Sequence, residues 1–245
     1  MNTIKKLSGL LQEMVQAVKN SNKAYRLASG AYYAHVFNNS INGCTWLANT
    51  PFSPGRWAIS YQALYVLFRI LQTLKPQYIM ELGLGQSSIM LGRYCSHFPQ
   101  ASCFTIEHDQ NWIDFFKTEH QTPANLNIKI LPLVREKRAH HSFCKYEGNL
   151  IPHAVAPLEL IIVDGPFSSP RNSRSQFLEL IPDFINPEKF AIMLDDIERK
   201  GEKETAKLLL KTLSNAGIPY KSHKYQGEKD FFVVCSPAHN FLLSL

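Results

Sequence analysis

The sequence lacks the features that mark secreted, zinc-stapled and membrane-spanning proteins. Its five cysteines are odd in number and widely scattered, and no two of them form a C-x-x-C pair. This argues against a disulfide framework and against a structural zinc site, and it favours a reducing compartment. No apolar run approaches the ~20 residues that a helix needs to cross a bilayer, so no transmembrane segment is expected. We therefore expect a cytoplasmic location.

Concentrated charge is also missing. The net charge is +6, but no long block of like charges marks a nucleic-acid-binding tail. A positive balance favours acidic partners, namely a nucleic acid, an anionic membrane surface, or a phosphorylated or carboxylated small molecule. The balance alone does not choose among these classes.

What is present is the composition of a globular protein. Hydrophobic residues make up 45% of the 245 positions, which suits one large α/β domain with an N-terminal extension. We expect the apolar face of an amphipathic first helix to pack onto the domain or onto a second subunit, giving a homodimer; an interfacial membrane helix is the alternative. Residues 38–56 are rich in turn formers and indicate a linker, so we assign 1–54 to an N-terminal helical extension and 55–245 to the main domain. The apolar positions of the first helix are Ile4, Leu7, Leu11, Met14 and Val18.

From residue 77 onward, short apolar runs alternate with helical segments. Strands separated by helices indicate βαβ units, which form a parallel, doubly wound sheet covered on both faces. After Gly217 two further strands form a hairpin, which nicotinamide-binding Rossmann domains usually lack. The sequence thus predicts a Rossmann-like α/β fold with a mostly parallel seven-stranded sheet and a C-terminal β-hairpin. The expected strands are 78–82, 102–107, 127–131, 158–163 and 190–195, and the expected helices lie near 86–95, 109–118, 172–185 and 202–216.

A glycine-containing loop joins the first strand to the following helix, with the sequence ELGLGQSS over residues 81–88. Gly83 and Gly85 allow a sharp turn and close approach of the backbone to a ligand. Glu81 would repel a pyrophosphate, and Ser88 replaces the third glycine of a dinucleotide fingerprint. A carboxylate here suits a ligand with a sulfonium and an α-ammonium group, through direct or water-mediated contacts. The loop therefore favours S-adenosylmethionine over NAD.

A second acid, Glu107, closes the strand SCFTIE about twenty residues after the loop. At the end of a second strand, a carboxylate is placed to accept both hydrogen bonds from a ribose diol. NAD and S-adenosylmethionine sites share this feature. The two acids together thus predict a nucleoside-type ligand.

These motifs resemble those of the class I S-adenosylmethionine-dependent methyltransferases over roughly residues 55–236. The resemblance rests on ELGLGQS, on IEHD after the second strand, on IIVDGPF at the fourth and on IMLDDI at the fifth. Ser87 departs from the usual third glycine of the family's first motif. The resemblance implies a cofactor site in which His108 lies near the adenine. The implied cofactor-binding residues are Glu81, Gly83, Gly85, Ser87, Glu107 and His108.

Three aspartates follow the fourth and fifth strands. Asp164 ends one strand, and Asp195 and Asp196 end the next, so all three should line one crevice. Converging carboxylates repel one another unless a cation joins them or a proton is taken up, and oxygen ligands suit Mg²⁺. This resembles the metal-dependent O-methyltransferases of the catechol and macrolide-sugar types, and it predicts Mg²⁺ bound by Asp164, Asp195 and Asp196. The alternative is that Asp164 acts alone as a general base or as a cofactor contact, while Asp195 caps a helix and Asp196 faces solvent.

Two basic segments, 135–156 and 168–174, are expected to overhang the crevice and to favour an anionic, sugar-like acceptor. Tyr146 and Phe167 are candidates for stacking on a sugar ring. Gly165 interrupts the proline pair of the base-amino methyltransferase motif, which makes nucleic-acid methylation a minor alternative. The sequence thus predicts O-methylation of a small or glycan acceptor, with a non-catalytic S-adenosylmethionine-binding module as a further alternative and Asp164 as the catalytic residue. The basic residues are Arg135, Lys137, Arg138, His140, His141, Lys145, Arg171 and Arg174, followed by Arg199.

Overall fold

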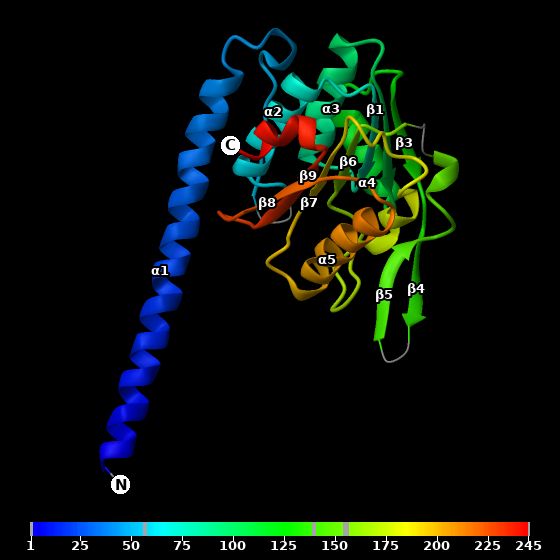
Figure 1. Ribbon diagram of the computed structural model, residues 1–245. Coiled ribbons are helices and arrows are strands. Elements are labelled where there is room, and N and C mark those ends of the chain that lie inside the picture. The colour runs from blue at the N-terminus through cyan, green and yellow to red at the C-terminus, as the bar shows by residue number, and fades with distance from the viewer. Residues whose placement is uncertain (1, 56–57, 139–140, 154–156, 245) are drawn as a thin grey trace.

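A seven-stranded sheet forms the centre of the computed structural model, which describes residues 2–55, 58–138, 141–153 and 157–244 (Figure 1). The strand order is β3-β2-β1-β6-β7-β9-β8. All neighbours pair in parallel except β9, which runs antiparallel to both β7 and β8. The predicted doubly wound fold with its C-terminal hairpin is confirmed. The strands are β1 (Tyr78–Leu82), β2 (Ser102–Glu107), β3 (Leu126–Ile130), β6 (Leu160–Val163), β7 (Ala191–Leu194), β8 (Lys221–Tyr225) and β9 (Phe231–Cys235).

Helices cover both faces of the sheet because its central strands are apolar on both sides. Neighbouring residues of β1 enter different cores: Ile79 packs with the helices α2 and α3, and Met80 packs with α5. A smaller cluster joins α4 to the start of α3 beside the glycine loop. The helix bounds are α1 (Asn2–Ile41), α2 (Tyr61–Leu74), α3 (Gln86–His97), α4 (Gln110–Glu119) and α5 (Lys200–Asn215).

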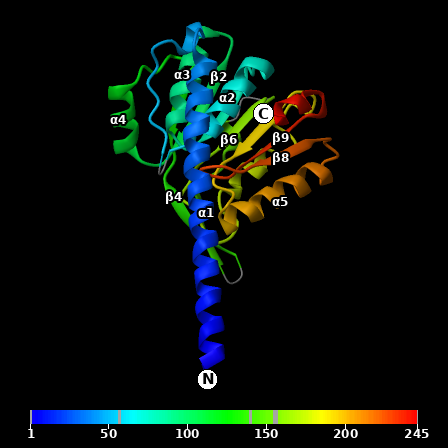
Figure 2. The same ribbon diagram turned by 90° about the vertical axis from the view of Figure 1, so that its left-hand side faces the viewer.

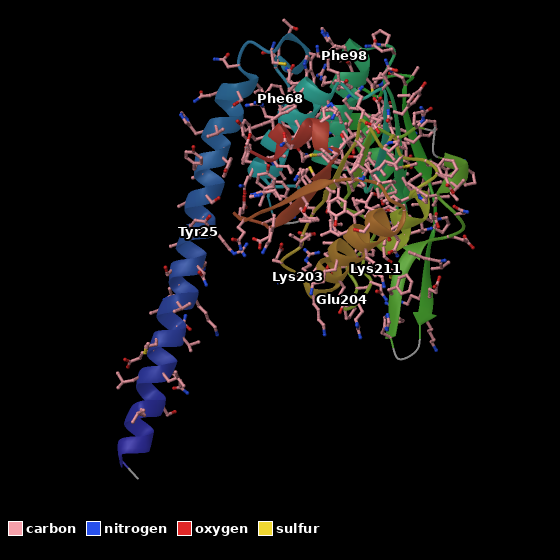
Figure 3. The ribbon with its side chains drawn as sticks, viewed as in Figure 1. Tyr25, Phe68, Phe98, Lys203, Glu204 and Lys211 are labelled. Atoms are coloured by element: carbon pink, nitrogen blue, oxygen red, sulfur yellow. The ribbon has the colours of Figure 1, made fainter. Side chains whose placement is uncertain are left out.

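The first helix, α1, is 40 residues long and projects far beyond the domain (Figures 1 and 2). Its C-terminal part packs on α2, and Phe37 is fully buried in the core. Farther back, Arg26 binds the carboxylate of Asp230 at 3.2 Å beside the β8–β9 hairpin. In Figure 3 the side chains of the domain, Phe68 among them, lie close together. The side chains of α1 on the N-terminal side of Tyr25 stand apart from the domain. None of the described helices is both long and apolar enough to cross a membrane.

The segment predicted as a linker is more ordered than its composition indicates. The helix α1 continues to Ile41, and a short 3₁₀ helix, η1 (Thr45–Leu47), buries Trp46 and Leu47 in the same core as α2. Apolar residues on both sides of position 54 thus share one core. The division of the chain at that position stays a prediction.

Two further segments differ from the expected elements. The region 172–185 contains a 3₁₀ helix, η3 (Ser175–Leu180), and no α-helix, because Asn172 and Arg174 have left-handed backbone angles and Pro182 cannot extend a helix. The connection before β6 contains an antiparallel hairpin of β4 (Leu133–Arg138) and β5 (His141–Tyr146). The remaining short helices are η2 (Ile151–His153) and η4 (Pro237–Leu243).

Candidate active site at the carboxyl ends of the parallel strands

The glycine loop leaves β1 and meets the end of β6 backbone to backbone. Gly83 has φ +100°, and a Cβ there would lie 2.9 Å from the amide nitrogen of Gly165. A Cβ on Gly165 would in turn collide with Tyr146 and with Gly83. Both glycines are therefore required by close packing, which also explains why glycine follows Asp164. Gly85 differs, since a Cβ there would meet no atom within 4 Å, leaving open space at the start of α3 for a ligand.

Glu81 lies beneath this loop and has no exposed surface. Its Oε2 accepts hydrogen bonds from the hydroxyls of Ser88 at 2.7 Å and Thr105 at 2.8 Å, and Ser88 in turn accepts one from the N–H of Gly85. The burial raises the pKa of Glu81 to about 7, against hydrogen bonds from Ser87, Ser88 and Thr105 that lower it. In this conformation the carboxylate supports the loop from within the core, and its contact with the cofactor stays a prediction.

Glu107 ties the same loop to the end of β2. Its Oε2 accepts from the N–H of Leu84 at 2.9 Å, and its Oε1 accepts from the N–H groups of His108 and Asp109. The Nδ1 of His108 lies 2.6 Å from the same Oε1. The structure thus brings together the glycine loop and the second-strand acid, as the sequence predicts. A carboxylate with four lone-pair sites keeps capacity on Oε2 for a ribose hydroxyl.

Two aromatic side chains border this region, and only one of them was indicated by the sequence. Phe167 is 63% exposed, and its ring contacts His108 edge to face at 4.6 Å between centroids. Trp112 on α4 donates a hydrogen bond from Nε1 to the carbonyl oxygen of Leu84 at 2.8 Å. No motif marks Trp112, because an aromatic residue on an amphipathic helix is usually part of a core.

The three predicted aspartates also converge. Each of Asp164, Asp195 and Asp196 offers a carboxylate oxygen within 4.8 Å of the others. Only Asp164 is open to solvent, with a side chain 20% exposed against 3% for each of the other two. Burial raises the pKa of Asp164, which the Arg174 guanidinium opposes, and burial and the nearby Asp164 carboxylate raise the pKa of Asp195 to about 8.

Basic side chains of the protein itself lie against this cluster. Arg174 lies 3.0 Å from Asp164 Oδ1 and 3.0 Å from Asp196 Oδ2. Arg199 lies 2.9 Å from Asp196, and the Lys229 amine lies 3.6 Å from Asp195 and 3.3 Å from Asp196. Arg174 and Arg199 were expected to face an acceptor, but both bind the aspartates instead. Charge alone could not reveal these pairings, because they depend on the path of the loop after β6.

A divalent metal ion does not fit this arrangement as it stands. Mg²⁺ requires carboxylate oxygens at ~2.1 Å in a near-octahedral shell and retains several waters. The Arg174 guanidinium already bridges two of the three carboxylates, and two further basic groups lie within 3.6 Å of the same acids. Mg²⁺ therefore stays a prediction from the sequence, and we derive no step through it.

Some of the remaining basic residues of the two overhanging segments already form ion pairs with acidic side chains. Lys145 pairs with Glu136 at 2.7 Å, and Arg171 pairs with Glu204 at 3.1 Å. The expectation that Tyr146 stacks on a sugar is wrong, because Tyr146 is fully buried, whereas Phe167 remains available. The side chain of Arg138 and the whole of His140 lie outside the described residues. Arg135 and Lys137 are exposed on β4.

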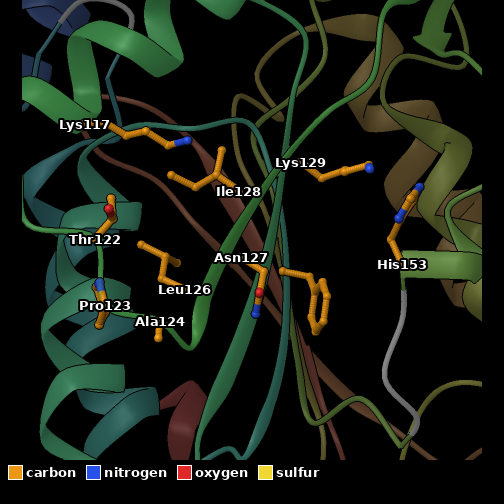
Figure 4. A pocket seen from close by; sticks show the side chains of 10 residues that line it. Lys117, Thr122, Pro123, Ala124, Leu126, Asn127, Ile128, Lys129 and His153 are labelled. Atoms are coloured by element: carbon orange, nitrogen blue, oxygen red, sulfur yellow. The ribbon is translucent and has the colours of Figure 1, made fainter.

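A groove of about 530 Å³ lies elsewhere, beside the edge strand β3 (Figure 4). Lys117, Lys129 and His153 lie on its rim together with apolar and polar residues of β3. No predicted cofactor-binding or metal-binding residue lines it. The groove is therefore separate from the strand ends at which the glycine loop, Glu107 and Asp164 meet.

Comparisons with known proteins identify the fold. At the sequence level, no family profile and no curated protein matches the chain significantly. The O-methyltransferase TomG of Streptomyces achromogenes, involved in tomaymycin synthesis and crystallised with S-adenosylmethionine, superposes with a TM-score of 0.52 and 16% identity over 74% of this chain and 82% of its own. This chain shares the Rossmann-like α/β fold of TomG.

A second solved structure has the same fold. An O-methyltransferase from Bacillus cereus, crystallised with S-adenosylhomocysteine, has a TM-score of 0.51 and 13% identity over 85% of this chain and 90% of its own. Identities this low show the fold alone. The chemistry has to be argued from the residues of this chain.

Proposed function

We propose that this protein transfers the methyl group of S-adenosylmethionine to a hydroxyl oxygen of a small, sugar-like, anionic acceptor. The observation that carries the proposal is the meeting of three features at adjacent strand ends. These are the glycine loop after β1, Glu107 at the end of β2, and the partly exposed Asp164 after β6. In open α/β sheets, ligands bind at this edge.

The cofactor side of the site is built from the loop and the end of β2. Open space beside Gly85 and the start of α3 would receive the methionine part, and Glu107 would accept a ribose hydroxyl. His108 and Phe167, which contact each other, would flank the adenine. Two fold neighbours were crystallised with S-adenosylmethionine and S-adenosylhomocysteine, which supports this ligand class here.

The transfer itself requires a group that takes the acceptor's proton. Bound S-adenosylmethionine supplies an electrophilic methyl group. Transfer to the acceptor oxygen would leave the carbon–sulfur electron pair on sulfur, and Asp164 would accept the proton of the acceptor hydroxyl. Asp164 suits this role because it is the one aspartate of the three that solvent reaches and because its pKa is raised by burial.

The expected acceptor class follows from charge and shape. The exposed Arg135 and Lys137 on β4 would attract an anion, and the exposed ring of Phe167 offers a face for a sugar. The two fold neighbours are described as O-methyltransferases, which supports oxygen as the methyl acceptor. Mg²⁺ is left out of the proposed reaction because the aspartates already bind basic side chains.

Methyl transfer is tested by following labelled methyl groups from S-adenosylmethionine into a panel of hexose phosphates and uronic acids. We expect an O-methyl product with the wild type, and about a 100-fold or greater loss of turnover in Asp164→Asn at unchanged cofactor affinity. Asp183→Asn, at an exposed position, is the matched control. Cofactor binding without transfer to any acceptor would instead indicate a non-catalytic module. Transfer of the labelled methyl group to RNA would indicate a nucleic-acid methyltransferase.

We also propose that α1 associates with α1 of a second copy to form a homodimer. Leu7, Leu11, Met14 and Val18 follow heptad spacing of four, three and four, and each is 59–65% exposed. Isolated helices are marginal in water, so a projecting helix with such a face gains stability from a partner. Spacing at heptad intervals favours a second helix over a flat membrane surface. A cytoplasmic location stays a prediction from the cysteine content.

A further inference from the structure

Arg174 occupies an unusual position in the acidic cluster. Its backbone is left-handed, with φ +57°, which a residue with a side chain adopts at a cost of ~1 kcal/mol or more. The side chain is only 5% exposed, although a guanidinium is strongly hydrated in water. Strain and burial together at one arginine indicate that its contacts hold it there.

The guanidinium contacts four oxygen atoms. One arm reaches Asp164 Oδ1 at 3.0 Å and the other reaches Asp196 Oδ2 at 3.0 Å. The Nε donates to the carbonyl oxygen of Pro166 at 3.1 Å, and a further contact of 3.4 Å reaches the carbonyl oxygen of Asp195. The planar fork of arginine suits two carboxylates at fixed positions, whereas a lysine would offer a single point charge.

The same cluster holds a second and a third cation. Arg199 also binds Asp196, and Lys229 lies near both Asp195 and Asp196. The three aspartates are therefore faced by three basic groups, and the buried acid Glu202 lies 3.9 Å from Arg174. A divalent ion placed among these aspartates would be repelled by the basic groups, whose attraction to the carboxylates is strong in a buried site.

We propose that the Arg174 guanidinium is the resident cation of this cluster, in the place that a divalent metal ion would need. The wild-type protein then binds no divalent metal at these aspartates. Arg174 acts as a positioning residue: it holds Asp164 through Oδ1 and leaves the second oxygen of that carboxylate for the acceptor. The statement about Asp164 rests on the proposed methyl transfer, whereas the statement about metal binding does not.

The metal part is tested by titrating the wild-type protein with Mn²⁺ and following free Mn²⁺ by electron paramagnetic resonance. We expect no stoichiometric site in the wild type. Arg174→Met removes the charge and keeps an extended stem. This variant should gain one Mn²⁺ site per chain, and its affinity for Mn²⁺ should exceed that of the wild type about tenfold or more. Arg171→Met is the matched control, because Arg171 lies on the same loop but pairs with Glu204.

Further variants assign the new site to the aspartates. Asp195→Asn added to Arg174→Met should remove the gained Mn²⁺ binding, and Arg174→Lys should gain none because the charge is retained. A stoichiometric Mn²⁺ site in the wild type that Asp195→Asn abolishes would overturn the proposal. So would a folded Arg174→Met protein that gains no site. If thermal unfolding shows that Arg174→Met does not fold, the wild-type titration decides.

The positioning part has a separate readout. At saturating cofactor, Arg174→Met should lower kcat for methyl transfer by about tenfold or more, Arg174→Lys should restore part of it, and neither should change cofactor affinity. EDTA should leave wild-type turnover unchanged, and loss of activity with EDTA that Mg²⁺ restores would overturn the proposal. The Mn²⁺ titration needs neither cofactor nor acceptor, so its failure can be told apart from failure of the proposed function.

Discussion

At the scale of single residues, the protonation of Glu81 makes the stability of the folded protein depend on pH. Its folded-state pKa of about 7 lies above the ordinary value of 4.5 because the carboxylate is buried. Below pH 4.5 both the folded and the unfolded state hold the proton; between 4.5 and 7 only the folded state keeps it. The stabilisation from this group is thus fully present below pH 4.5 and is lost as the pH rises through 7.

We therefore expect Glu81→Gln to change how stability depends on pH. From pH 4.5 to pH 8, the wild type should lose ~3 kcal/mol of unfolding free energy that the variant keeps. Urea unfolding of both proteins at several pH values measures the difference. Glu188→Gln, at an exposed position, controls for the loss of one carboxylate. Equal pH profiles for wild type and Glu81→Gln would show that the folded protein does not hold this carboxyl as described.

The sequence predicted correctly which residues lie close together in the site. It did not predict the hydrogen-bond and ion-pair partners of each side chain. The glycine loop, Glu107 and Asp164 were found because strand ends follow from the apolar pattern, and parallel strands place those ends together. The burial of Glu81 and the pairing of Arg174 depend on a loop whose path no pattern specifies. From its charge, Arg174 was expected to bind the acceptor. In the structure it forms ion pairs with Asp164 and Asp196 instead.

At the scale of elements, regular strands and helices were predictable and irregular segments were not. The helices α3, α4 and α5 match their expected ranges because each has an amphipathic pattern. The region 172–185 has similar apolar spacing, but left-handed residues and Pro182 prevent an α-helix. The β4–β5 hairpin was missed because the strand LVREKR is too charged to show an apolar alternation.

The exposed face of α1 gives a prediction at this scale. Leu11→Glu should weaken the proposed dimer about tenfold or more, since it places a charge in the apolar seam. Gln12→Glu adds the same charge on the polar face and should leave the dimer intact. Sedimentation velocity over a range of concentrations measures both. A monomeric wild type, or equal behaviour of the two variants, would contradict the dimer, and binding of that monomer to anionic vesicles would favour the interfacial helix.

At the scale of the whole molecule, the strand order brings the ends of β2, β1 and β6 together at the edge where we propose that the ligand binds. The fold neighbours share this architecture at 16% identity or less, so their chemistry does not transfer by likeness. What decides the ligand class is whether this edge accepts a nucleoside bearing a positive sulfonium in preference to a dinucleotide with a charged diphosphate.

Calorimetric titration of the full chain with S-adenosylmethionine, S-adenosylhomocysteine and NADH tests this most directly. We expect one site per chain for the first two ligands and none for NADH. Glu107→Gln should weaken S-adenosylmethionine binding by about tenfold, since a hydrogen bond to a charged acceptor is lost. Stoichiometric binding of NADH with no binding of S-adenosylmethionine would contradict the account.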